Sequence, residues 1–534
     1  MISSLLSFAL GGIFNTSFFF YISFRRTITL LYNNVIVRLS AFFVNYPLFF
    51  RGIVCPLSEE LSGSSIALHY CDINATLYQP AAVHISRSLS AYSYRKNCEA
   101  CMLPFLEHIN QLLWGFPVLI LLSSAHLYFT AKLKFPQRLT LKAIRLSVTP
   151  EKNAKGANLS GFAALATTLA ATLGTGNIIG VSTAIAIGGP GALFWCWITG
   201  VLGMATCYAE CYLSVLFKKQ KPDKTYVGGP MYVLEQGLHS KPLGILYAAC
   251  ALFAAFGVGC TTQSSAITEA VNTIAPVSPH IIGILAAFTA GLVILGGVKS
   301  IGKFCTRMVP ALGFFYIGCC LYLLFLNRHF IFSGLSLILG SAFQTKAAAG
   351  GFIGSTLQSA ARFGIARGLF TNEAGIGTAA IAAASSETRD PRRQSLISMT
   401  AVFWDTVVMC AVTGLVIVTN IQKNPSSILG FSSASLTSAA FTFLPFGGAT
   451  LLSLALVAFA ITTLIGWCYY GERAAEYLFG ESGIVSYHLC YIVMIYIGAV
   501  LPMDLVWGMT DLINGIMVFP NVIALFALRK KIHI

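Results

Sequence analysis

Long apolar stretches separated by short polar loops fill the chain from about residue 110 to its end. A helix needs about 20 predominantly apolar residues to cross the hydrocarbon core of a bilayer. Eleven segments have this character, near residues 111–131, 160–187, 191–217, 243–271, 279–298, 304–326, 333–365 with an interruption, 395–420, 446–471, 484–502 and 504–528. The pattern therefore predicts an all-α polytopic membrane protein with about eleven transmembrane helices.

Composition narrows the class of protein further. Of the 534 residues, 56% are hydrophobic and 10% are charged, whereas soluble globular domains carry about 25% charged residues. These values exclude a soluble enzyme, a nucleic-acid-binding domain and a disulfide-stapled secreted module. Most of the 15 cysteines lie within or at the ends of the apolar spans, where cysteine acts as a small apolar residue.

The net charge of +15 is distributed unevenly between the loops. Basic residues gather after alternate spans: Lys132, Lys134 and Arg138; Lys218, Lys219 and Lys221; Lys299, Lys303 and Arg307; Arg362, Arg367, Arg389, Arg392 and Arg393; Arg473; and Arg529, Lys530 and Lys531. The intervening loops 188–190 and 272–280 contain no lysine or arginine. Because cytoplasmic loops are enriched in basic residues, the first span is predicted to enter from outside and the C-terminus to be cytoplasmic.

Two spans carry glycine clusters near their middle. The span 160–187 has Gly174, Gly176 and Gly180 around Thr175 and Asn177, and the span 333–365 has Gly350, Gly351 and Gly354. Such glycines can serve close helix packing, or they can mark a helix that unwinds against a polar cavity. The two spans lie five helices apart and run in opposite directions, which favours an inverted repeat of five helices with a broken helix opening each half.

A broken helix suggests the chemistry of the ligand. Unwound backbone exposes N–H groups at the N-terminus of a half-helix, and these attract a carboxylate. It also exposes carbonyl oxygens, which suit a hard cation such as Na⁺. An amino acid transported together with a cation would use both features.

Six motifs resemble the alanine/glycine:cation symporter family. They are GTGNIIGVSTAIAIGGPGALFW, YVGGPMYVLEQGL, ARGLFTNEAGIG, WDTVV, IGWCYYGERAAEYLFG and MDLVWGMTDLINGIMVFPN, in this order from about Met102 to the C-terminus. The resemblance implies a leucine-transporter-like fold with one extra N-terminal helix. It also implies uptake of a small neutral amino acid, alanine or glycine, coupled to Na⁺ or sometimes H⁺, across a bacterial inner membrane. No other cofactor and no nucleic-acid partner is implied.

The resemblance also implies site residues. Those expected at the substrate are Thr175, Gly176 and Asn177 in the first break, Gly350, Gly351 and Phe352 in the second, and Gln263, Thr463 and Trp467. Cys260 and Ser265 stand where the family usually has asparagine, which leaves the preferred substrate open. By analogy with the wider fold, Na⁺ is expected between the first break and span 446–471, at Ala170, Leu173, Thr462 and Thr463.

Two aspartates in or near the spans, Asp405 and Asp504, leave alternatives to a symporter. An intramembrane enzyme could use them as a carboxylate pair, but neither lies in a GxGD stretch and the chain has no HExxH motif. A channel predicts rings of polar residues rather than two broken helices. We expect Asp405 to act in gating or coupling, and Glu210, Arg362, Glu373, Glu472 and Arg473 to form a solvated network at the cytoplasmic ends.

Residues 1–101 lie outside the resemblance and form a separate N-terminal extension to the transmembrane domain 102–534. They combine broken apolar stretches with a polar, serine-rich segment at 55–101. The extension is either a signal or additional membrane anchor, or an upstream stretch or dispensable leader with translation beginning at Met102. We favour the second interpretation, because a chain that starts at Met102 keeps all eleven spans.

Overall fold

The computed structural model describes residues 108–110, 112–114, 116–150, 159–343, 357–425, 435–445, 447–501 and 504–534. The extension 1–101 and the predicted break residues Gly350, Gly351 and Phe352 lie outside the described residues. What is predicted for them therefore stays a prediction.

The described chain is almost entirely helical. The elements of its first half are α4 (Phe116–Lys132), α5 (Thr140–Val148), α6 (Gly161–Thr172), α7 (Val181–Gly188), α8 (Gly191–Leu216), β1 (Lys219–Gln220), β2 (Tyr226–Val227), α9 (Pro230–Tyr232), α10 (Lys241–Phe256), α11 (Thr262–Asn272), α12 (Pro279–Ile294) and α13 (Gly297–Leu326). Those of its second half are α14 (Ile331–Phe343), α15 (Leu357–Asn372), α16 (Thr378–Ala384), α17 (Pro391–Val402), α18 (Ala411–Lys423), α19 (Leu436–Phe441), α20 (Gly448–Phe479), α21 (Ser482–Val500) and α22 (Asp504–Ala527). Three π-helical segments interrupt the long helices, η2 (Gly176–Gly180), η4 (Gly257–Thr261) and η6 (Phe403–Cys410).

The helical, membrane-spanning class of the fold is confirmed. Among the described residues, seven helices are long and apolar enough to cross a membrane, or up to nine if each of two bent helix pairs is one span. The helix α12 has only 16 residues, and part of the predicted span 333–365 lies outside the described residues. The count of eleven therefore stays a prediction.

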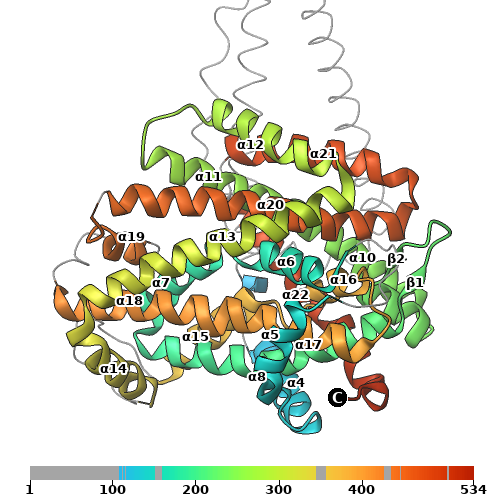
Figure 1. The fold of residues 1–534 in the computed structure, drawn as a ribbon, viewed down its shortest axis with the longest axis horizontal. Coiled ribbons are helices and arrows are strands. Elements are labelled where there is room, and N and C mark those ends of the chain that lie inside the picture. The colour runs from blue at the N-terminus through green and yellow to red at the C-terminus, as the bar shows by residue number, and fades with distance from the viewer. Residues whose placement is uncertain are drawn as a thin grey trace, which may run out of the picture. The chain divides into compact units, whose positions relative to one another are not determined.

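Helix α14 differs from its expected place as the first half of a crossing helix. Gly334 near its start packs against Thr419 of α18, and Ala342 near its end accepts a hydrogen bond of 3.1 Å from Trp195 of α8. Helix α8 is antiparallel to the continuous helix formed by α17, η6 and α18, because its residues Leu193, Gly200 and Cys207 contact Gly414, Thr406 and Ser398 in turn. Both ends of α14 therefore lie at the same end of the bundle (Figure 1). Its 13 residues span only about 20 Å, which is too short to cross the bilayer.

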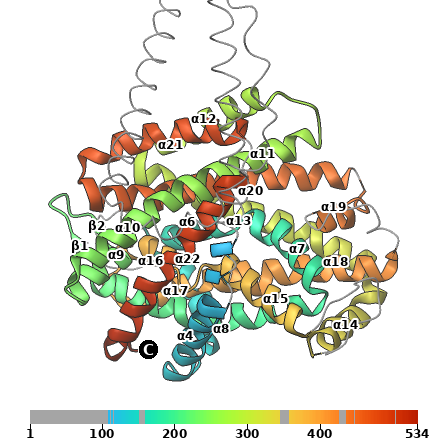
Figure 2. The same cartoon turned by 180° about the vertical axis from the view of Figure 1, so that it is seen from behind.

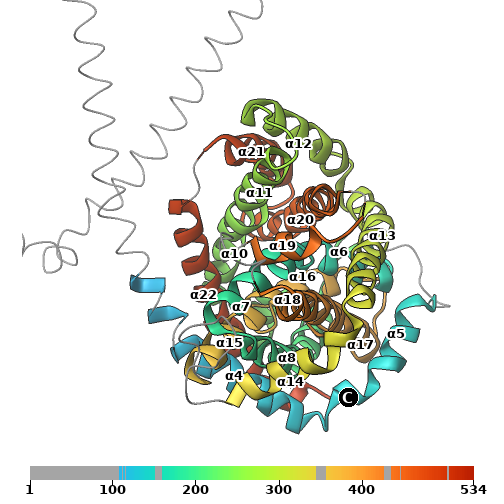
Figure 3. The same cartoon turned by 90° about the vertical axis from the view of Figure 1, so that its left-hand side faces the viewer.

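The two ends of the bundle carry different elements. Helices α14 and α19 lie at the end toward which α7 runs, which we call the α7 end (Figure 1). Helix α16 and the hairpin β1–β2 lie toward the other, the α16 end. Viewed from the α7 end, α12 and α21 pack together at one edge, and α4 and α5 lie on the opposite side (Figure 3). From behind, α22 runs beside α10 toward the C-terminus (Figure 2).

Glycines bring the central helices into close contact. A Cβ atom on Gly364 of α15 would collide with the carbonyl oxygen of Ala192 on α8. Likewise, a Cβ on Gly466 of α20 would lie 2.7 Å from the amide nitrogen of Ala171 in α6. Small residues favour helix packing within membranes, because they let backbones approach closely and gain van der Waals contact.

This packing predicts a strong position dependence of glycine substitutions. Gly364→Ala should destabilise the protein by about 1–3 kcal/mol, because the added methyl group forces α15 away from α8. Gly313→Ala on α13 is the matched control, since a Cβ there meets no atom within 4 Å and alanine is the better helix former. Thermal unfolding in detergent should give a lower midpoint for Gly364→Ala only. Equal midpoints would contradict the close contact.

Candidate functional site

The first broken helix is the frame of the candidate site. Helix α6 ends at Thr172 and α7 begins at Val181, and the two halves are bent by 53°. The interruption predicted from the glycines of this span is therefore present. The amide nitrogen of Gly174 donates to Oδ1 of Asn177 at 3.0 Å. In a continuous helix this amide would bond the Ala170 carbonyl, so Asn177 replaces a main-chain partner at the break.

Asn177 also joins the break to the segment η6. Its Nδ2 donates to Oδ1 of Asp405 at 2.7 Å and to the Asp405 carbonyl at 3.1 Å. The Asp405 carboxylate accepts a second bond of 2.7 Å from the hydroxyl of Thr406. Asp405 is completely buried, and a buried carboxylate needs such partners to offset its desolvation. The aspartate that the sequence singled out therefore lies directly beside the first break.

Helix α20 meets the break from the other side. Oγ1 of Thr463 lies 3.3 Å from the Leu173 carbonyl and 3.0 Å from the Phe459 carbonyl. A hydroxyl has one hydrogen, so it satisfies only one of these carbonyls at a time. The hydroxyl of Thr462 donates to the Phe459 carbonyl at 2.7 Å, within its own helix. Of the predicted cation ligands, the structure thus brings Thr463 directly to Leu173, while the Thr462 hydroxyl bonds within α20.

Two buried polar atoms near the break lack a hydrogen-bond partner in the described structure. Gln263 donates from Nε2 to the Val258 carbonyl at 3.2 Å, but its Oε1 is unpartnered and lies 3.8 Å from the position of a Cβ on Gly174. Nε1 of Trp467 is also unpartnered. An unsatisfied buried polar atom costs about 1–3 kcal/mol, so both atoms are available to a bound molecule.

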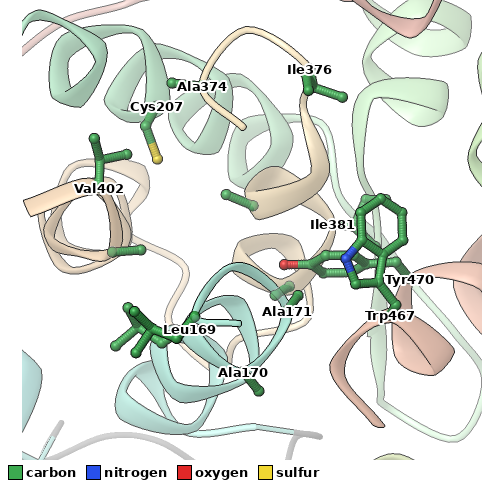
Figure 4. Close-up of a cluster of buried hydrophobic side chains, with 14 of the residues drawn as sticks. Leu169, Ala170, Ala171, Cys207, Ala374, Ile376, Ile381, Val402, Trp467 and Tyr470 are labelled. Atoms are coloured by element: carbon green, nitrogen blue, oxygen red, sulfur yellow. The ribbon is translucent and has the colours of Figure 1, made fainter. Parts of the chain in front are cut away.

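Trp467 forms part of a buried wall beside α6. Its ring packs edge-on against Tyr470, with ring centroids 5.6 Å apart, and Gly259 of η4 lies against its Cβ. Figure 4 shows Trp467 and Tyr470 side by side on α20, near Ala171 of α6. By contrast, the thiol of Cys260 is directed toward the Tyr491 carbonyl, 3.6 Å away on α21. The cysteine that departs from the family pattern therefore has its polar contact with α21.

Helix α19 meets the first break from the α7 end. The hydroxyl of Thr437 donates to the Ile178 carbonyl in η2 at 2.8 Å, and the amide of Leu436 donates to the Ser182 hydroxyl at 2.9 Å. The Ile178 carbonyl, which also accepts from the amide of Val181, thus gains a second partner from another element. The hydrophobic pattern of the sequence did not predict this short helix.

A second interruption lies between α15 and α16. Helix α15 ends at Asn372 and α16 begins at Thr378, and Glu373, Gly375 and Gly377 between them have φ of 53°, 99° and 95°. A Cβ on Gly176 would lie 3.6 Å from Thr371, so this turn is next to the first break. The NEAGIG stretch lies in one of the family motifs, but the break in this span was predicted at Gly350–Phe352. The signal was the pair of glycines, which permit left-handed backbone.

Glu210 and Asn521 hold this turn in place. Oε1 of Glu210 accepts bonds from the Gly375 amide at 2.8 Å and from Nδ2 of Asn521 at 2.6 Å. Nδ2 of Asn521 also donates to the Gly375 carbonyl at 2.9 Å. The predicted solvated network is therefore wrong for its buried members, Glu210, Glu373, Glu472 and Arg473, which are 2%, 7%, 2% and 5% exposed. Glu210 and Glu373 bond within and around the turn instead.

The ion pairs of the α16 end connect α20 to the hairpin. Nη1 of Arg473 lies 2.6 Å from Glu476, and Nζ of Lys221 lies 2.7 Å from both Glu476 and Glu481. Burial lowers the pKa of Lys221, but the hydrogen bonds to the two glutamates outweigh it, so its pKa is raised. Arg362 does not belong here, because α15 carries it on the opposite side of the break. Its expected place in one network with Glu210, Glu373, Glu472 and Arg473 is wrong, and it lines a cavity beside α4 instead.

Comparisons with known proteins agree on one family. A profile of the sodium:alanine symporter family matches residues 99–534. The chain is 42% identical to the "Sodium/alanine symporter AgcS" of Methanococcus maripaludis, over 79% of this chain and 93% of the relative. It is 35% identical to the "Probable sodium/glutamine symporter GlnT" of Bacillus subtilis, over 81% and 90%. A solved Na⁺-coupled sialic acid symporter has a TM-score of 0.51 at 14% identity, covering 78% of this chain and 88% of its own. That likeness shows the fold alone, which is leucine-transporter-like.

The bond between Asn177 and Asp405 predicts a strong energetic coupling. Asn177→Ala leaves the Asp405 carboxylate and the Gly174 amide without their partner, and should cost about 1–3 kcal/mol. In a double-mutant cycle with Asp405→Ala, the two effects should deviate from additivity by about 0.5–3 kcal/mol. Thermal unfolding in detergent measures the cycle, and Thr289→Ala on the exposed face of α12 replaces Asp405→Ala in the control cycle. Additive effects in both cycles would show that the bond contributes nothing.

Proposed function

The chain belongs to the sodium:alanine symporter family, and on this premise we propose that it imports alanine or glycine together with Na⁺ by alternating access. The family and its relatives are transporters, so the alternative of an intramembrane enzyme using Asp405 and Asp504 is wrong. The observation that carries the proposal is the break in the helix at Leu173 and Gly174, just before η2, flanked by unsatisfied polar groups of two other helices.

The substrate carboxylate is proposed to bind at the backbone of Thr175, Gly176 and Asn177. The N-terminus of η2, which continues into α7, directs the amides of its first turn and the positive end of the helix dipole toward this segment. Gln263 contributes its unpartnered Oε1 as an acceptor for the substrate ammonium. Gly350, Gly351 and Phe352 remain proposed substrate residues, and the turn at 373–377 adds a second stretch of unwound backbone next to Gly176.

The coupling Na⁺ is proposed to bind between α6 and α20, at Ala170, Leu173, Thr462 and Thr463. Break carbonyls and threonine hydroxyls supply the oxygen ligands that a hard cation prefers. The Ala170 carbonyl has lost the amide of Gly174 to Asn177, and the Leu173 carbonyl shares the Thr463 hydroxyl with Phe459. Both carbonyls can therefore turn to a cation at little cost. H⁺ remains the alternative coupling ion, with the buried Asp405 as the group that would carry it.

The protein is an integral membrane protein, and we place it in a bacterial inner membrane with the C-terminus and the α16 end cytoplasmic. The basic residues support this orientation: Arg389, Arg392 and Arg393 follow α16, and Arg529, Lys530 and Lys531 follow α22. The α7 end then faces outward, so α14 and α19 form its outer cover.

Uptake into proteoliposomes tests the proposed function. Labelled alanine, glycine and glutamine are offered separately under an imposed Na⁺ gradient, an imposed H⁺ gradient or neither. We expect accumulation of alanine or glycine under the Na⁺ gradient, and weaker uptake of glutamine. If neither gradient drives accumulation of any of the three amino acids, the proposal is wrong. Accumulation of glutamine alone would overturn the choice of substrate but not the transport mechanism.

Removing one cation ligand should weaken the binding of Na⁺ more than the binding of substrate. Loss of the Thr463 hydroxyl in Thr463→Ala should cost about 1–3 kcal/mol in a site without water. The Na⁺ concentration for half-maximal uptake should then rise roughly 5- to 150-fold. Thr419→Ala is the matched control, because that buried hydroxyl bonds carbonyls of its own helix only. An unchanged Na⁺ dependence of Thr463→Ala would remove this residue from the site.

Trp467, with Phe352, is proposed to set the upper size limit of the substrate. Trp467→Ala removes the buried ring beside η4 and should admit larger side chains such as leucine. The preference for alanine over leucine in competition assays should fall by about tenfold or more, since each extra methylene is worth about 1–3 kcal/mol in a hydrophobic pocket. Trp195→Ala at the α14 contact is the control. If Trp467→Ala only lowers the thermal midpoint and its substrate range is unchanged, the tryptophan is merely part of the core.

A further inference from the structure

A cavity that holds two oppositely charged side chains lies next to the first break, on its α7 side. It has a volume of about 260 Å³ and is lined by the segment just before α4 and by α7, α15 and α22. The lining residues include Trp114, Thr183, Phe363, Arg367, Phe370 and Asp511. Pockets for drug-sized ligands measure about 300–1,000 Å³, so this cavity suits a smaller molecule. Three aromatic rings and one hydroxyl surround one cationic and one anionic side chain.

Arg367 enters the cavity from α15, and no carboxylate of the described residues pairs with it. Its guanidinium packs on Gly180 at the end of η2, where Nη1 would lie 2.7 Å from an added Cβ. It also lies over the Phe370 ring, with Cζ 5.4 Å from the ring centroid. None of the ion pairs among the described residues includes Arg367. The missing side chain of Gly180 is therefore what allows this cation to reach the break.

Asp511 faces the same cavity from α22. Its Oδ1 is buried and has no hydrogen-bond partner in the described structure. Its main-chain carbonyl accepts a hydrogen bond of 2.8 Å from Nε1 of Trp114, which fixes this part of α22 against the segment just before α4. The charges of Asp511 and Arg367 attract each other, yet the two side chains form no ion pair within 4.0 Å.

Opposite charges held apart across a cavity have a specific physical consequence. Ionised groups within a membrane protein are costly and normally pair with one another or with a ligand. An arginine offers a planar fork of N–H donors that matches a carboxylate, and an aspartate accepts hydrogen bonds from an ammonium group. A molecule that carries both a carboxylate and an ammonium would bridge Arg367 and Asp511. A simple anion would satisfy only Arg367.

We propose that this cavity is a second binding site for a zwitterionic amino acid, with the carboxylate at Arg367 and the ammonium at Asp511. Arg367 lies one helical turn before Thr371, the residue that faces Gly176. A ligand bound at Arg367 would therefore lie about one turn of α15 from the central site. That the bound amino acid is the transported one rests on the function proposed above. The cavity then serves as a staging site on the path from the α7 end to the break.

Equilibrium binding of labelled L-alanine to the full chain in nanodiscs, with saturating Na⁺, tests the proposal. The wild-type protein should bind in two classes of site. Arg367→Gln and Asp511→Asn should each weaken one class at least tenfold and leave the other within about twofold. Arg362→Gln is the matched control, because Arg362 lies on the same helix and lines a different cavity. Propionate, which lacks the ammonium, and ethylamine, which lacks the carboxylate, should not displace alanine from the second class.

Each other result counts against the proposal. A single class of site in the wild-type protein overturns it without any variant, so it stays testable even if Arg367→Gln fails to fold. Loss of the second class in Arg367→Gln but not in Asp511→Asn indicates an anion site and also overturns it. If gradient-driven uptake is intact while only one class is found, this inference alone fails. If alanine neither binds nor accumulates, the proposed function fails as well.

Discussion

Within a lipid bilayer every backbone N–H and C=O must find a partner inside the protein. This constraint makes the broken helix α6–α7 energetically unfavourable unless its backbone groups are satisfied, and several surrounding elements supply the hydrogen bonds. The Gly174 amide bonds to Asn177, the Ile178 carbonyl accepts from Thr437 of α19, and the Leu173 carbonyl accepts from Thr463 of α20. Each of these side chains comes with an element that must be in place, so the break is stable only in the assembled bundle.

The second interruption obeys the same constraint with charged partners. The turn at 373–377 is buried, and its backbone is held by the carboxylate of Glu210 and the amide of Asn521. Two helices that lie far apart in the sequence, α8 and α22, thus fix both peptide groups of one residue, Gly375. A movement of α22 or α8 during transport would release this turn directly. The glycines of α15 let this helix pack closely on α8, and those of α20 let it pack closely on α6. This close packing brings the hydrogen-bonding groups of both interruptions within reach of their partners.

Most of the buried charges described above fall into two groups, according to the groups that they bind. Glu210 and Asp405 hold backbone or amide groups and have an evident structural task. Arg473, Glu476 and Lys221 neutralise one another at the α16 end, between α20 and the hairpin. Arg367 and Asp511 belong to neither group, because they face each other across a cavity without touching. This difference is the reason for assigning a ligand to that cavity and not to the other charged clusters.

The sequence by itself determined the features that depend on local composition. Apolar stretches predict helices in a membrane wherever they lie, and three glycines beside Asn177 predict the first interruption because helix breaking is a property of adjacent residues. Thr463 could be named as a cation candidate from the sequence because its motif is contiguous, and its role in binding Na⁺ stays a prediction. The tertiary structure decided what depends on distant contacts. Asn177 meets Asp405 across 228 residues and Glu210 meets Gly375 across 165. Helix α14 does not form half of a crossing helix, because both its ends pack at the α7 end of the bundle, on the start of α8 and the end of α18. Hydropathy alone does not distinguish such a helix from half of a span, since both are apolar and only the position of their partners differs.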